Sequence, residues 1–150
     1  MRKSFVAAAV LLLSSSVGNA QQKQPVNVVI QAAPEQIKKA ALAMFARNGY
    51  SLDSETASQL KISQPLTTEE TDAYNTANWT NPPVSNCRHV QTFLLSPVDH
   101  ATGVAMVSDL VCHRDGMWLI FRNPNEKEIQ LMRNTLANLK SKTEEADKRR

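Results

Sequence analysis

The sequence has few aromatic residues and few glycines, and both shortages restrict what the chain can be. Aromatic side chains make up 5% of the residues, and glycine occurs four times. Aliphatic side chains and methionine must therefore form most of any core. The glycine-rich loops that bind phosphates and dinucleotides are missing, as are the G-x-S-x-G and H-E-x-x-H motifs of hydrolases and zinc proteases. We therefore expect no cofactor and no catalytic residues of these classes, and we expect a protein that is not an enzyme.

The only long apolar run lies at the start of the chain. Two basic residues precede residues 5–13, which are all apolar, and small residues follow as far as Ala20. This is the pattern of a secretory signal peptide cleaved after Ala20. The run has about half of the ~20 apolar residues that a membrane-spanning helix needs, and no later run approaches that length. We therefore expect residues 1–20 to be a signal peptide, the mature protein to be periplasmic or secreted, and no part of it to span a membrane.

An excess of one charge is also missing once this segment is removed. The whole chain has 17 basic and 14 acidic residues, which gives a net charge of +3. Removing Arg2 and Lys3 leaves 15 basic and 14 acidic residues. A nearly neutral protein has no overall electrostatic attraction to nucleic acid or to anionic lipids. We therefore expect no nucleic-acid partner.

The rest of the chain is predicted to be one domain. Cleavage leaves about 130 of the 150 residues, which is enough for a single core. We expect residues 21–140 to form this domain. The mixed charges of residues 141–150 are typical of a solvated C-terminal tail, most often the fraying end of a helix.

The first part of the domain is predicted to form a strand, a helix and two further strands. Residues 26–32 alternate as a strand does. Pro34 suits the first position of a helix, and the glycine of Asn48-Gly49 suits its left-handed end. Lys38 and its neighbouring lysine are expected on the solvent side of this helix. Two short strands then follow around a turn at residues 54–58.

The only two cysteines allow a strand register to be predicted. Cys87 and Cys112 each lie in a segment that alternates as a strand does. If these segments form an antiparallel hairpin with the cysteines opposite each other, Phe93 faces Met106. One face of the hairpin then holds both cysteines and most of the large apolar side chains. The second face is also about half apolar.

The same register extends to a third strand. Asp115-Gly116 is a strong signal for a two-residue hairpin turn. The turn brings Phe121 to the cysteine face and places Asp109 opposite Arg122, which are oppositely charged. One assumption about the cysteines thus explains an apolar face and a charge pair. We therefore predict a disulfide between the two cysteines, which also fits an exported chain with an even number of cysteines.

Two alternatives for the cysteines are a metal site and a reactive thiol pair. A metal site would combine Cys87 and Cys112 with His89 and His113, but this spacing is not usual for zinc, and His113 lies on the opposite face in the predicted register. A redox pair would normally show C-x-x-C, which is missing. We therefore expect no metal site.

A last helix completes the predicted fold. Asn123 suits its cap and Pro124 its first position. Its apolar side chains recur at helical spacing and are expected to cover the sheet; they are Ile129, Met132, Leu136 and Leu139. The predicted fold is therefore α+β, an antiparallel sheet of five or six strands with two helices packed on one face and one disulfide.

The segment of residues 67–86 is the least regular part of the domain. A threonine at its start favours a short helix through Tyr74, and two consecutive prolines prevent a helix later in the segment. Long connections of this kind are often functional. Tyr74 and Trp79 are therefore the candidate binding residues. The alternative is that both side chains cover the edge of the core.

Other cues for catalysis are weak. Asp99 and His100 follow Ser96 closely and imitate part of a hydrolase site, and the adjacent acids Glu69 and Glu70 are candidates for acid–base chemistry. A small periplasmic enzyme or an enzyme inhibitor that uses residues 67–86 is therefore the alternative function.

One part of the chain is similar to known envelope proteins. A strand followed by residues 33–63, "APEQIKKAALAMFARNGYSLDSETASQLKIS", resembles the helix-on-sheet modules of bacterial envelope proteins, such as the C lipoprotein of the outer-membrane barrel assembly machinery. Accessory proteins of secretion and conjugation systems carry comparable domains. The resemblance implies a non-catalytic binding or assembly factor with a protein partner in the cell envelope.

Overall fold

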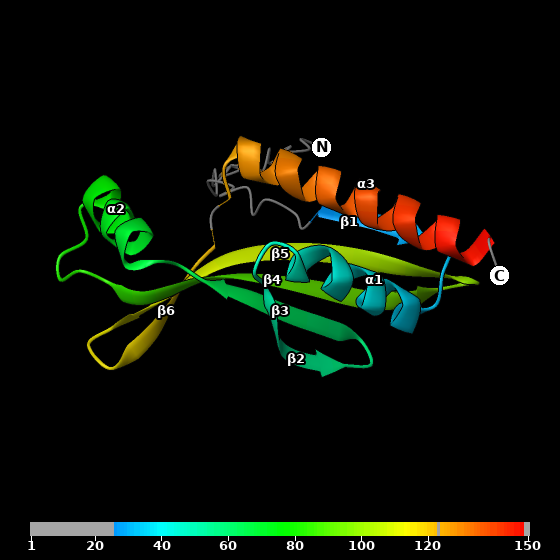
Figure 1. Cartoon of the computed structure of the whole chain (residues 1–150), viewed down its shortest axis with the longest axis horizontal. Helices are drawn as coiled ribbons and strands as arrows, with labels where there is room; N and C mark the ends of the chain where they lie inside the picture. Colours follow the sequence, from blue (N-terminus) through cyan, green and yellow to red (C-terminus); the bar gives the residue numbers. More distant parts are fainter. Residues whose placement is uncertain (1–25, 123, 149–150) are drawn as a thin grey trace, which may run out of the picture.

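The structure is a computed structural model that describes residues 26–122 and 124–148. The predicted signal peptide of residues 1–20 lies outside the described residues, as does the predicted cap Asn123. The described chain is α+β, with a six-stranded antiparallel sheet and three helices (Figure 1). In chain order the elements are β1 (Val26–Ile30), α1 (Pro34–Ala46), β2 (Ser51–Thr56), β3 (Gln59–Pro65), α2 (Thr68–Asn78), β4 (Ser85–Val98), β5 (Ala101–Arg114), β6 (Met117–Phe121) and α3 (Glu126–Lys148).

The two longest strands, β4 and β5, organise the sheet. The strand order is β1-β5-β4-β3-β2, and β6 also pairs with β5. Because β4 occupies one edge of β5 along its length, β1 and β6 share the other edge. There β1 pairs with residues 102–106 and β6 with residues 110–114. The first and last strands of the described chain, β1 and β6, therefore extend the same edge of β5.

The predicted register and the predicted disulfide are confirmed. Cys87 and Cys112 form a disulfide that joins β4 to β5. Phe93 pairs with Met106, as expected from the position of the cysteines. The alternation of side chains along the strands was sufficient to predict this arrangement, because a shift of one residue would turn every apolar side chain to the other face.

All three helices pack on the same face of the sheet. The main core lies between α1, α3 and one face of the strands. A second group, which we call the disulfide cluster, lies at the other end of this face beneath α2. It contains Val84, Cys87 and Cys112, with Leu66, Tyr74, Leu110, Leu119 and Phe121 packed around them. Within the described residues no helix packs on the opposite side of the sheet, which we call the helix-free face.

The expectation of two helices is corrected by α2, which is a full third helix. Its start is a capping box: the Glu70 N–H donates to Thr67 Oγ1 at 3.2 Å, and the Thr67 N–H donates to Glu70 Oε2 at 2.8 Å. This reciprocal pair satisfies donors that a helix N-terminus otherwise leaves free. Packing of Tyr74 on the disulfide cluster then holds the helix against the sheet.

The chain after residue 140, where we expected a solvated tail at a fraying helix end, is helical. Up to Lys148 it forms the last turns of α3, in which Thr143 is 3% exposed. The mixed charges of this segment predicted that it is exposed to solvent. In a helix, however, the charged side chains can lie on one side while the other side packs on the protein. The helix begins at Glu126, two residues later than predicted, because Asn125 caps it by accepting from the Glu128 N–H at 2.9 Å.

The connection between β2 and β3 is shorter than expected. The strands extend to Thr56 and from Gln59, so that residues 57–58 alone form the turn. Residues 54–56, predicted as turn, pair with β3 after a bulge. None of the helices in the described chain is long and apolar enough to cross a membrane.

Candidate functional site

Trp79 is the most exposed large apolar residue among those described, with 90% of its surface accessible. It forms the C-cap of α2 in the left-handed conformation, with φ of 50°, and its N–H donates to the Asn75 carbonyl. A left-handed residue that is not glycine costs about 1–2 kcal/mol. Trp79 therefore combines an unfavourable backbone conformation with a side chain that buries almost nothing.

Tyr74 lies five residues earlier on the same helix and packs inward. Its ring packs against Phe121, with ring centres 5.7 Å apart, at the edge of the disulfide cluster. Partial burial raises the pKa of the Tyr74 hydroxyl. Tyr74 thus covers the edge of the core, whereas Trp79 projects into solvent, and α2 does not bring the two side chains onto one surface.

The loop that carries Trp79 is held by the side chain of Asn75. Asn75 Nδ2 donates to the Val84 carbonyl, and Asn75 Oδ1 accepts from the Val84 N–H, both at 2.9 Å. The Thr80 hydroxyl also donates to Asn75 Oδ1. These bonds connect the two ends of residues 79–84. Trp79 is therefore presented by a braced loop.

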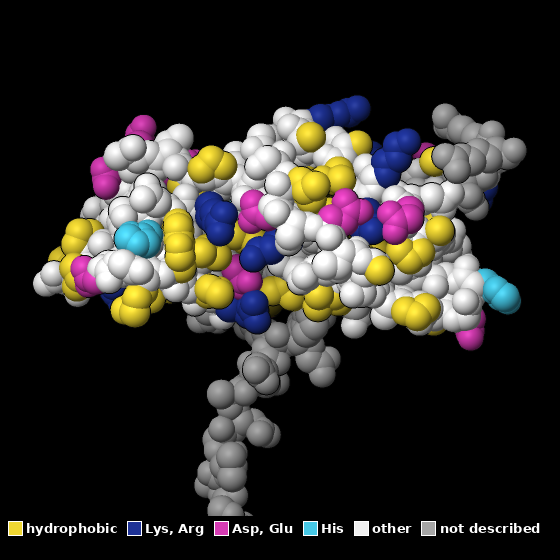
Figure 2. All heavy atoms as spheres, turned by 90° about the horizontal axis from the view of Figure 1, so that it is seen from below, with side chains coloured by type: hydrophobic (Ala, Val, Ile, Leu, Met, Phe, Trp, Pro, Cys, Tyr) yellow, Lys and Arg dark blue, Asp and Glu magenta, His cyan; other side chains and the backbone are white. Residues whose placement is uncertain are grey.

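The helix-free face exposes several large apolar side chains that the sequence analysis did not single out. Trp118 and Ile120 on β6 are 56% and 63% exposed. Val29 on β1 and Leu94 on β4 are also exposed and lie on the same face by the strand register. Seen from the side opposite α3, hydrophobic side chains reach the surface between basic and acidic ones (Figure 2). The available signal was the half-apolar pattern on the second face of the predicted hairpin.

Basic side chains surround Trp118. The Arg88 guanidinium lies 5.3 Å from the centre of the indole ring, and the His113 ring lies 5.3 Å away in an edge arrangement. Arg88 also approaches Asp53 at 3.6 Å, whereas its Nε is buried without a hydrogen-bond partner. A cation over an indole face is attracted to the ring. Arg88 thus orients Trp118 from one side.

Two further features mark the helix-free face. Asp109 is buried there and accepts two hydrogen bonds from Arg122, at 2.7 and 2.9 Å, which raise the pKa of the guanidinium. This is the charge pair expected from the sequence. Farther along β5, a shallow depression of about 390 Å³ lies over Gly103, with Val29 and Leu94 among its walls. The face thus offers exposed apolar groups and a hollow.

The residues considered for chemistry do not form a reacting group. The disulfide removes both cysteine thiols, which excludes the reactive pair and cysteine ligation in this state. Glu70 serves as a helix cap, and the Thr67 N–H and hydroxyl lower its pKa. Ser96 donates to the Gly103 carbonyl, and nothing in the described chain joins it to His100 by a hydrogen bond. Across residues 26–122 and 124–148, no three His, Cys, Asp or Glu side chains are grouped as metal ligands would be.

Comparison of the chain with models of protein families finds no match, and comparison with curated proteins finds no similar sequence.

Proposed function

We propose that the protein is a non-catalytic binding or assembly factor, exported to the bacterial cell envelope, that contacts a protein partner through the helix-free face of its sheet. The observation that carries this proposal is the exposure of Trp118 and Ile120 on a face that no described helix covers, with Val29 and Leu94 exposed farther along the same face. Accessory proteins of secretion or conjugation machinery are the class that fits an exported protein of this kind.

The chemistry of this face favours a protein as the partner. Exposed apolar side chains that neighbour each other, as Trp118 and Ile120 do on β6, often mark interaction sites. Tryptophan and arginine are enriched among the residues that contribute most to protein–protein binding, and Trp118 and Arg88 are in contact here. Because the side chains of Trp118 and Arg88 already contact each other, they lose less conformational entropy when a partner binds.

The disulfide supports the proposed location. Disulfides persist in oxidising compartments, such as the periplasm and the extracellular medium, and are rare in the cytosol. Cys87 and Cys112 are paired here and leave no free thiol. An exported protein is the simplest explanation for a small single domain with this bond.

A photo-crosslinking amino acid at Ile120 tests the proposal in the cells that produce the protein. We expect a discrete adduct with another envelope protein, and we expect Trp118→Ser to remove it because the neighbouring contact is lost. The matched control is the same cross-linker at Leu131, which is 65% exposed but lies on α3. Equal labelling from both positions, or no adduct from Ile120, would contradict a partner on this face.

The second candidate function uses Trp79 instead. An enzyme or an enzyme inhibitor that acts through residues 67–86 is favoured by one observation, the braced and exposed tryptophan of this loop. Trp79→Ala should then abolish activity or inhibition without changing the melting temperature. Tyr74 is not a suitable partner in this test, because its ring contributes to packing on Phe121.

A further inference from the structure

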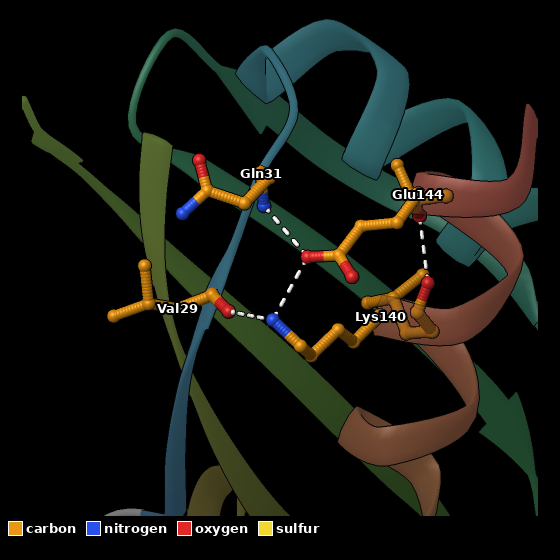
Figure 3. Close-up of polar contacts among 6 residues, drawn as sticks. Val29, Gln31, Lys140 and Glu144 are labelled. Atoms are coloured by element: carbon orange, nitrogen blue, oxygen red, sulfur yellow. Dashed lines mark hydrogen bonds and ion pairs between the residues drawn. The ribbon is translucent and has the colours of Figure 1, made fainter. Parts of the chain in front are cut away.

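The outer edge of β1 is closed by α3 along only part of its length. Lys140 Nζ donates to the Val29 carbonyl at 2.7 Å, and the Gln31 N–H donates to Glu144 Oε1 at 2.9 Å (Figure 3). Lys140 and Glu144 are also joined to each other at 2.8 Å. Two side chains of α3 thus bond the backbone groups that a neighbouring strand would otherwise pair with.

The remaining part of this edge is identified by the alternation of an antiparallel ladder. In such a ladder, the N–H and C=O of one residue point to the same side, and the next residue points to the other side. Since Val29 and Gln31 direct backbone groups toward α3, Asn27 directs its N–H and C=O the same way. No hydrogen bond in the described chain reaches these two groups of Asn27 from α3.

The spacing of α3 explains why Asn27 is left without such a partner. One helical turn of four residues advances about 6 Å, and two strand residues advance about 7 Å, so the helix and the strand stay in step. Lys140 faces Val29, so the turn before it, which contains Leu136 and Ala137, faces Asn27. Neither Leu136 nor Ala137 has a polar side chain to offer. The helix therefore leaves the strand edge open at this position.

A groove occupies this position. It has a volume of about 450 Å³ and runs between β1 and α3, with Asn27, Ala137 and Arg133 among its lining residues. This volume is within the range of sites that bind small ligands or short segments. The charges of Lys140 and Glu144 balance each other, which leaves Arg133 as the excess positive charge of the lining. Within the described residues Arg133 contacts Glu126 at 3.6 Å and donates a long hydrogen bond to Gln130 Oε1 at 3.5 Å, and exposed contacts of this kind contribute little.

We infer that this groove binds a short extended segment of a partner protein, which adds one strand to β1 through the backbone of Asn27 and places an acidic side chain against Arg133. Unpaired backbone groups at a sheet edge recognise an extended chain whatever its side chains are, and neighbouring charges select among sequences. The β1 strand of a second copy does not fit, because its own α3 flanks it. The inference rests on the proposed function in taking a protein as partner, and it adds a second contact region.

The probe is a pool of synthetic eight-residue peptides built from valine, isoleucine and threonine, with either two glutamates or two lysines at one end. Immobilised protein should retain glutamate peptides over lysine peptides. Asn27→Pro should weaken binding of the best retained peptide at least about tenfold, because proline lacks the backbone N–H that the peptide would bond. The fold should tolerate this proline, because the N–H of Asn27 points away from β5. Asn27→Ala keeps the N–H and should bind as the unchanged protein does.

A charge reversal provides an independent arm. Arg133→Glu should change the preference from glutamate peptides to lysine peptides. The control is Arg47→Glu, which changes the net charge equally at an exposed position at the end of α1. It should leave the preference for glutamate peptides unchanged. If Asn27→Pro fails to fold, Ala137→Leu replaces it, since the larger side chain fills the groove without changing the strand. The inference would be overturned if the protein retained no peptide, or if Asn27→Ala weakened peptide binding as much as Asn27→Pro does. It would also be overturned if the protein dimerised through this groove and bound no peptide. Cross-linking at Ile120 is independent of this result, so the two proposals fail separately.

Discussion

Single residues of this protein take positions that their chemistry alone does not predict, and Lys38 is the clearest case. The sequence placed it on the solvent side of α1, yet it is 4% exposed. Its ammonium group contacts Glu35 and Glu55 at 2.8 Å each and donates to the Thr56 carbonyl at 3.1 Å. The hydrogen bonds to both carboxylates raise its pKa. A buried charge is tolerated when all of its donors are used, and here two of the three partners come from the adjacent β2.

Trp79 leads to the first prediction. Replacing it with glycine should raise the free energy of unfolding by about 0.5–1 kcal/mol. Glycine adopts the left-handed conformation without strain, and this gain should exceed the cost of the extra conformational entropy that glycine gives the unfolded chain. Urea denaturation of the two proteins measures this difference. Trp79→Ala keeps the Cβ atom and should not be stabilised. A clear loss of stability in Trp79→Gly would mean that the indole contributes to folding and is not reserved for binding.

At the scale of elements, the contact of α3 with β1 is the one that sequence patterns miss. The apolar stripe of α3 was sufficient to predict that it covers the sheet, and four of its apolar residues lie in the main core. The closing of the strand edge by Lys140 and Glu144 depends on polar side chains, whose partners a periodic pattern does not reveal. The Gln31–Glu144 bond joins residues 113 positions apart.

This contact makes stability depend on pH. The Gln31 N–H, and after it Lys140, lower the pKa of Glu144 from its ordinary value of 4.5. A carboxylate with a lowered pKa in the folded state stabilises the fold above the unfolded pKa and loses this effect as the pH falls through the folded pKa. The stability advantage of the unchanged protein over Glu144→Gln should therefore be largest near neutral pH. It should shrink as the pH falls below about 4.5.

Urea denaturation of both proteins, from about pH 7 down to about pH 3, measures this dependence. In a Lys140→Met background the stability lost through Glu144→Gln should vary less with pH, because one cause of the lowered pKa has been removed. A stability difference that stays constant across this range would show that the charge of Glu144 does not matter to the fold.

At the scale of the whole molecule, the disulfide holds the end of the sheet that the main core does not reach. It spans 25 positions of the chain and lies in the small cluster beneath α2. The double variant Cys87→Ala/Cys112→Ala should lower the free energy of unfolding by about 3 kcal/mol, because the unfolded chain regains the freedom of that loop. Denaturation of the variant and of the oxidised protein measures the loss, and a loss below about 1 kcal/mol would contradict this account.

Local sequence patterns were sufficient to predict the register of β4, β5 and β6, the disulfide and the start of α1. These features depend on alternation, on turn residues such as Asp115-Gly116, and on a proline at a helix start, all of which act between near neighbours. The third helix was only partly visible, since α2 has a capping signal but few apolar residues to mark its length.

Which surfaces stay open depends on how the elements pack together, and local patterns did not predict it. This packing placed all three helices on one face, turned Tyr74 inward and Trp79 outward, and left Trp118 exposed on the other face. It also set the turn of α3, with Leu136 and Ala137, that lies opposite Asn27. These outcomes depend on the packing of segments far apart in the chain, for which a local pattern carries no information.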